Sequence, residues 1–240
     1  MATKAGAQPV VPKTRAASKA AKAGGRSVDE VSADSKARRY DPAETRARVI
    51  EAGFMLFATR GYSGTGTADI AREADVSEGS IFYHFGSKRA LMGELGRVHG
   101  GRMIAAMQEN DPLDQLHPAN VVRRCFAFCA TDMAWKALKG RVDPATGKEC
   151  VDDHSNPEAE PFFLASREVV QQWVESHISA YCAAHGIMGI HPGITASMTF
   201  ALVGDALHRA AHGAPEDHAL VREQCARMVA VGCGADYTPL

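Results

Sequence analysis

The residues with the most distinctive chemistry lie between Thr67 and Lys88. Hydroxyl, imidazole and ammonium groups follow one another closely there, and these are the groups that bond phosphate oxygens and the edges of bases. The segment from Glu78 to His84 has the length of a short helix that could enter a major groove with Glu78 and Gly79 leading. We therefore expect one DNA-contacting surface formed by Thr67, Ser77, Glu78, Gly79, Ser80, Tyr83, His84 and Lys88.

A first helix is needed to support this surface, and its start is predicted at Asp41-Pro42-Ala43-Glu44. Asp41 is a good N-cap, proline suits the first helical position, and a carboxylate suits the third. Ile50, Phe54 and Phe57 belong to an apolar stripe at helical spacing. Gly61 is the expected C-cap, because glycine adopts a positive φ at little cost.

Two shorter helices are expected to follow, separated by a tight turn. Thr67 is predicted to cap the second helix and Ser77 the third. Asp75 stands in the turn between them, where a left-handed residue is needed and Asp is tolerated. Ile81 and Phe85 are the expected apolar anchors of the third helix. Three helices in this order predict a helix-turn-helix domain over residues 41–86.

This stretch resembles the N-terminal domain of TetR-family regulators. The motifs that carry the resemblance are Thr45 to Ala52, Leu56 to Tyr62, Ile70-Ala71, Val76 to Gly79 and Tyr83 to Lys88. Asp75 and Phe82 depart from the pattern, which usually has glycine and often tyrosine there. The resemblance implies that six of the residues above occupy DNA-contacting positions, namely Thr67, Ser77, Ser80, Tyr83, His84 and Lys88.

The charge of the chain is unevenly distributed. Residues 1–40 hold nine Lys/Arg against three Asp/Glu, a balance of +6, and almost no large apolar residues. They are expected to be a disordered basic arm, which either follows the DNA backbone or acts only as a solubilising tail. No apolar run is long enough to span a membrane. Six scattered cysteines favour reduced thiols, so we expect a cytoplasmic, nucleoid-associated protein.

Residues 87–240 are expected to form a helical domain, which makes the whole chain all-α. A helix from Ser87 to Met107 contains four glycines, which indicates either a bent or interrupted helix or close packing against a neighbour. Further helices are predicted at 119–139, 162–185, 193–212 and 215–231, with a break from Gly140 to Pro161. By resemblance, the last two helices form a homodimer interface, which would require a near-palindromic operator.

The resemblance also implies a small effector bound in the helical domain. Few charged residues interrupt the apolar faces, so an apolar or amphipathic effector is favoured over a polar one. Each candidate contact is more often a plain core residue than a ligand contact. The candidates are Phe126, Cys129, Met133, Phe163, Trp173 and Met198.

Other functions have weaker support. A metal loop at Cys150 to His154 lacks paired ligands at metal-binding spacing, and Cys125 and Cys129 on an apolar stripe are poor oxidant sensors. No nucleotide-binding, hydrolase or metalloprotease motif is present, so no catalytic residue, metal or cofactor is expected. The interpretation is a ligand-responsive repressor. The alternative is a DNA-binding protein of the same fold that organises DNA or answers to a protein partner.

Overall fold

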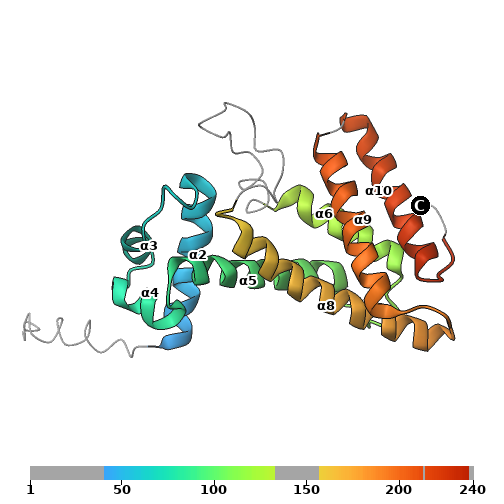
Figure 1. The fold of residues 1–240 in the computed structure, drawn as a ribbon, viewed down its shortest axis with the longest axis horizontal. Helices are drawn as coiled ribbons and strands as arrows, with labels where there is room; N and C mark the ends of the chain where they lie inside the picture. Colours follow the sequence, from blue (N-terminus) through green and yellow to red (C-terminus); the bar gives the residue numbers. More distant parts are fainter. Residues whose placement is uncertain (1–40, 133–156, 213, 238–240) are drawn as a thin grey trace, which may run out of the picture. The chain divides into compact units, whose positions relative to one another are not determined.

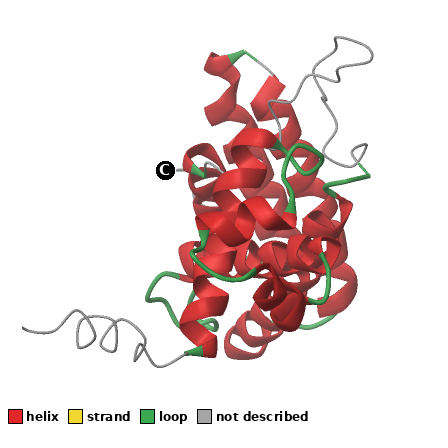
Figure 2. Ribbon diagram, turned by 90° about the vertical axis from the view of Figure 1, so that its left-hand side faces the viewer, coloured by secondary structure: helices red, strands yellow, loops and turns green. Residues whose placement is uncertain are grey.

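The computed structural model describes residues 41–132, 157–212 and 214–237, and within these ranges every regular element is a helix (Figures 1 and 2). The predicted all-α class is therefore confirmed. The basic arm and the Cys150 to His154 loop lie outside the described residues. The elements are α2 (Pro42–Arg60), α3 (Thr67–Glu73), α4 (Glu78–Phe85), α5 (Lys88–Gln108), α6 (Pro118–Thr131), α8 (Glu160–His185), α9 (Pro192–His212), a 3-10 turn η1 (Pro215–Asp217) and α10 (His218–Gly232).

Four of the predicted helix ends have the expected local chemistry. The Asp41 carboxylate accepts the Ala43 N–H at 2.8 Å, and α2 ends at Gly61 with φ 74°. The hydroxyl of Ser77 caps α4, and that of Ser87 accepts the Ala90 N–H at the start of α5. These caps depend on residues two or three positions apart, which is why the sequence predicts them well.

The predicted cap of α3 is wrong by one residue. Gly66 is the N-cap, and Thr67 is the first residue of the helix. The reason is Asp69, whose carboxylate accepts the Gly66 N–H at 3.1 Å and thereby stabilises the earlier start. The Thr67 hydroxyl therefore does not cap its own helix.

Two hydrophobic cores share α5. The smaller core joins α2, α3 and α4 to the first half of α5 through Leu91, Met92 and Leu95. The larger core joins the second half of α5, through Met103 and Met107, to α6, α8, α9 and α10. The long helix α5 thus extends from one core into the other (Figure 1).

The glycines of α5 do not interrupt it, since it is one continuous helix of 21 residues. A Cβ added at Gly96 would lie 2.1 Å from the carbonyl oxygen of Phe162, and one at Gly100 would lie 3.1 Å from that of Ser166. The expectation of an interruption is wrong, and close packing is confirmed at these two positions. The partner is α8.

The remaining helices follow the predicted order with shifted ends. The described part of the 119–139 helix ends at Thr131, and its predicted continuation lies outside the described residues. The helix predicted to start at 162 begins two residues earlier, at Glu160. The segment predicted as one helix from Pro215 is a 3-10 turn followed by α10. None of the described helices is long and apolar enough to cross a membrane.

Candidate DNA-binding surface

The short helix α4 is held by one side and exposes the other. Ile81 is completely buried in the smaller core, whereas the side chain of Tyr83 is 79% exposed. The turn before α4 contains Asp75 with φ 52°, as predicted. Arg48 of α2 lies 3.7 Å from the Asp75 carboxylate, so the turn is also held from α2. A helix fixed in this way can present its outer face to a ligand without moving.

Four of the predicted contact residues are bonded to one another in pairs. The Thr67 hydroxyl donates to a Glu78 carboxylate oxygen at 2.5 Å, which links α3 to the first residue of α4. Ser77 and Ser80 have hydroxyl oxygens 2.8 Å apart, and the Ser77 oxygen also accepts the Ser80 N–H. The polar groups that lead α4 are therefore ordered by the protein itself.

The end of α4 carries exposed rings. Tyr83 and His84 meet edge to face, with ring centroids 5.1 Å apart. Sequence reasoning treated Phe82 only as a departure from a motif, yet its side chain is about half exposed beside Tyr83. The signal was available, because a residue next to fully buried Ile81 points about 100° away from it in a helix. An exposed phenyl ring suits apolar contact with a thymine methyl group.

Lys88 is engaged within the protein. Its Nζ donates to the carbonyl oxygens of Tyr62 at 2.8 Å and Thr65 at 3.0 Å, and lies 3.9 Å from the centre of the Tyr62 ring. An ammonium group has three N–H bonds, so two are used inside the domain. The predicted phosphate contact of Lys88 stays a prediction. Its role in holding the loop before α3 is visible.

The predicted effector residues are not brought together. Phe126 and Cys129 are buried in the larger core, and Trp173 packs partly against it. Phe163 packs against the smaller core instead. Met198 is 69% exposed on α9, and Met133 lies outside the described residues. Phe126, Cys129 and Trp173 are thus the candidates that share one core.

The thiols of the larger core are protected. Cys125 and Cys129 are both buried, and the hydrogen bond with Cys129 followed by burial raises the pKa of Cys125 well above its ordinary value. Burial also raises the pKa of Cys225 to about 12. Neutral thiols are poor nucleophiles, which agrees with the expectation that they are not sensors. The residues that the structure describes include no group of three or more His, Cys, Asp or Glu side chains placed to hold a metal ion.

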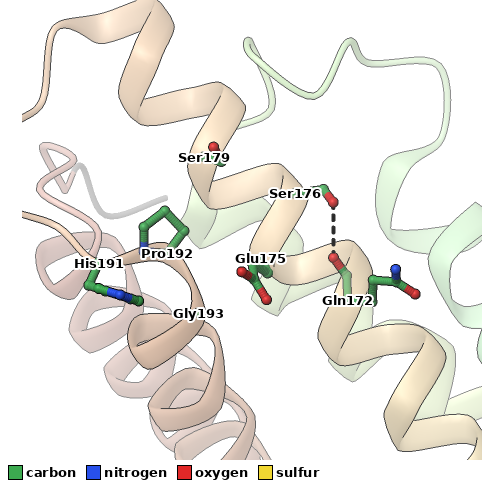
Figure 3. A pocket seen from close by; sticks show the side chains of 7 residues that line it. All are labelled: Gln172, Glu175, Ser176, Ser179, His191, Pro192 and Gly193. Carbon is green, nitrogen blue, oxygen red and sulfur yellow. Dashed lines mark hydrogen bonds between the residues drawn. The ribbon is translucent and has the colours of Figure 1, made fainter.

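A polar pocket of about 420 Å³ lies between α8 and the start of α9 (Figure 3). Ser176 donates to the backbone carbonyl of Gln172 within its wall. The pocket does not coincide with the predicted effector residues. It is lined by Gln172, Glu175, Ser176, Ser179, His191, Pro192 and Gly193.

Residues 49–95 match the family model described as bacterial regulatory proteins of the tetR family. That range begins in α2, contains α3 and α4, and ends in α5 at Leu95. The N-terminal helices are thus similar to the DNA-binding domain of TetR-family regulators. The match covers the three-helix unit and the part of α5 that completes its core.

The curated relatives that the chain matches are HTH-type transcriptional regulators. The chain is 31% identical over 111 residues to the HTH-type transcriptional regulator TtgR of Pseudomonas putida, which is 45% of this chain and 51% of TtgR. It is 42% identical over 50 residues to the HTH-type transcriptional repressor DhaR of Mycobacterium sp., 21% of this chain and 25% of DhaR. The chain thus spans about half of the length of TtgR and about a quarter of the length of DhaR.

Solved structures extend the likeness to the whole TetR-type fold. Salmonella enterica GusR superposes with a TM-score of 0.57 at 21% identity, covering 82% of this chain and 100% of GusR. Bacillus subtilis FadR, determined in complex with stearoyl-CoA, gives a TM-score of 0.53 at 17% identity, covering 78% and 98%. At such identities these structures show a common fold, an N-terminal helix-turn-helix domain followed by a helical domain.

Proposed function

We propose that the protein is a sequence-specific transcriptional repressor that binds a near-palindromic operator as a homodimer and is released by a small effector. The observation that carries this proposal is the geometry of α4. Ile81 fixes the helix from inside, while Tyr83 and Glu78 project from an exposed surface whose polar groups are already ordered. The TetR-family match over these helices, and relatives named as transcriptional regulators, support it.

The homodimer is supported by an apolar surface on the last two helices. Ile194 and Met198 are exposed on α9, and Leu220, Met228 and Val231 are exposed on α10. Large apolar side chains left exposed on two helices that pack together suit a protein interface. A two-fold dimer would place two α4 helices about 34 Å apart, one turn of DNA, so the operator would have two inverted half-sites.

A small apolar or amphipathic effector would bind in the helical domain. The candidates that share the larger core are Phe126, Cys129 and Trp173. The complex of FadR with stearoyl-CoA supports small-molecule control within this fold. We infer no catalytic activity. We propose a DNA-binding domain over residues 41–86 and an effector-binding and dimerisation domain over residues 87–240, with α5 contributing to the cores of both.

Selection of binding sites from random and genomic DNA tests the proposal. The purified protein is incubated at near-physiological salt with competitor DNA, because non-specific binding is mostly electrostatic and would dominate at low salt. We expect recovery of an inverted repeat bound by two copies of the chain. Recovery of no common sequence, with binding that disappears as salt rises, would contradict sequence-specific regulation and favour a DNA-organising protein.

A further inference from the structure

His99 is a buried polar residue at the boundary between the two cores. Its side chain is 2% exposed and lies on α5, one turn after Leu95 of the smaller core and one turn before Met103 of the larger core. Its Nε2 donates to the Asp132 carboxylate at 2.6 Å, and its Nδ1 lies 3.2 Å from the Ser166 hydroxyl. We call His99, Asp132 and Ser166 the His99 cluster.

The cluster lies where the backbones of α5 and α8 touch. Gly96 and Gly100 stand on either side of His99, and a Cβ at either position would crowd a carbonyl oxygen of α8, that of Phe162 or of Ser166. The Phe162 ring also packs on His99, with centroids 5.0 Å apart. Because the backbones approach so closely at Gly96 and Gly100, one helix cannot slide past the other without a clash. The helices α5 and α8 therefore behave as one unit here.

The third member of the cluster comes from another helix. Asp132 is the C-cap of α6, and Phe128, one turn earlier, meets the His99 ring edge to face at 5.6 Å. The carboxylate accepts a short bond from an imidazole that is almost fully buried. Such a bond is directional and costly to break without a replacement partner. The C-terminal end of α6 is thereby tied to the α5–α8 pair.

From His99 the connection continues to the DNA-binding helices through packed side chains. Leu95 is one turn away on α5, and its Cδ1 lies 3.2 Å from where a Cβ of Gly53 on α2 would be. Leu91 packs against the same glycine. A rotation or shift of α5 at His99 must therefore move α2 or open this contact.

We propose that the His99 cluster is a positioning device that holds the end of α6 against α5 and thereby sets the orientation in which α5 presents the DNA-binding helices. The inference rests on the proposed function as a dimeric DNA-binding protein. In a dimer, the orientation of each α5 sets the separation of the two α4 helices. His99 is accordingly a positioning residue for half-site spacing and touches no DNA itself.

The test compares operator binding by variants of the cluster on DNA of altered spacing. Wild-type protein should bind its selected operator more tightly than versions with one base pair inserted or removed between the half-sites. His99→Leu and Asp132→Ala, which leave no hydrogen bond between the two positions, should lose between about twofold and thirtyfold in affinity for the native spacing, the size of effects seen for coupling residues. They should also discriminate less between spacings. His99→Gln, whose amide can donate to Asp132, should recover part of both properties.

His177→Leu is the matched control. His177 is also 2% exposed, and its Nε2 donates to the Leu116 carbonyl at 2.7 Å, but it belongs to the helical domain alone. A structural role for His99 would lower the unfolding temperature in both Leu variants and leave spacing preference intact in both. That result overturns the inference. If His99→Leu fails to fold, unchanged operator affinity and unchanged spacing preference in Asp132→Ala overturn it instead. If the wild-type protein selects no operator with two half-sites, the proposed function fails and the inference with it.

Discussion

The hydroxyl of Thr67 on α3 donates a hydrogen bond of 2.5 Å to the carboxylate of Glu78, the first residue of α4. The bond uses one oxygen lone pair and leaves the carboxylate able to accept further hydrogen bonds. Because it joins two helices, it also restricts the rotamers that Glu78 can adopt. An acidic side chain at the leading end of α4 cannot favour phosphate, so a base edge is the contact that suits it.

Glu78→Gln should change the base preference of the operator at one position in each half-site. A carboxylate accepts from the N4 amino group of cytosine, whereas a glutamine amide pairs with adenine, and each such contact is worth roughly 1–3 kcal/mol of discrimination. Binding-site selection with both proteins measures the change. Thr67→Val is the companion variant and should keep the preferred base with weaker discrimination. Identical base preferences for wild type and Glu78→Gln would remove Glu78 from the contact surface.

Tyr83→Ala should weaken operator binding without unfolding the protein. The ring is 79% exposed, so its removal opens no core cavity, while a lost ring contact with DNA costs affinity. Operator titration together with thermal unfolding measures both effects. Met188→Ala removes another exposed side chain, outside the DNA-binding helices, and should alter neither. Equal operator affinities in the two variants would contradict the assignment.

Lys88→Met should destabilise the DNA-binding helices. The ammonium group donates to the carbonyl oxygens of Tyr62 and Thr65, and its loss leaves these acceptors without that partner, at about 1–3 kcal/mol. Thermal unfolding and the salt dependence of operator binding separate the two roles of Lys88. If the lysine only contacts a phosphate, stability stays the same and the slope of log affinity against log salt falls by about one.

Gly96→Ala should destabilise the protein, whereas Gly101→Ala should stabilise it. A Cβ at Gly96 would lie 2.1 Å from the Phe162 carbonyl oxygen, so α8 must move away. A Cβ at Gly101, in the same helix, meets no other atom within 4 Å, and alanine is favoured over glycine there by about 1 kcal/mol. Chemical denaturation measures both. Similar unfolding free energies would show that the two helices do not touch at Gly96.

Protonation of Glu223 should make the protein less stable in acid. The bidentate hydrogen bonds from Arg123 are the main cause that lowers the pKa of Glu223 to about 2, and the Tyr237 hydroxyl donates to it as well. Because the folded pKa lies below the ordinary value of 4.5, this stabilisation is present above pH 4.5 and is lost as the pH falls toward 2.

Glu223→Gln should accordingly lower stability at neutral pH by about 2 kcal/mol and flatten the loss between these pH values. Urea denaturation across the pH range measures both effects. Glu51→Gln is the control, because the Glu51–Arg102 ion pair is largely exposed and worth less than about 1 kcal/mol. If Glu223→Gln keeps the wild-type acid sensitivity, the ion pair between α6 and α10 does not contribute to it.

The sequence alone determined the helical class and the ends of helices that short-range chemistry controls. Asp41 and Ser77 cap helices because the backbone N–H groups that donate to their side chains lie within three residues, and Asp75 adopts the left-handed turn between α3 and α4. The motifs around α4 also carried the resemblance to TetR-family regulators, which the family-model match over residues 49–95 supports, since they lie in one continuous stretch. Local signals of this kind require no knowledge of which helices pack together.

Only the tertiary structure decided what depends on residues far apart in the chain. Lys88 finds its acceptors 23 and 26 residues away, so its spacing could not separate phosphate contact from an internal role. At Gly96 the sequence left a bent or interrupted helix and close packing equally open, and the contact with α8 decided for close packing. His99 was not singled out at all, because Asp132 and Ser166 are 33 and 67 residues distant. The partners of a side chain on other helices are decided by how the helices pack, and the spacing of residues in the sequence does not predict this packing.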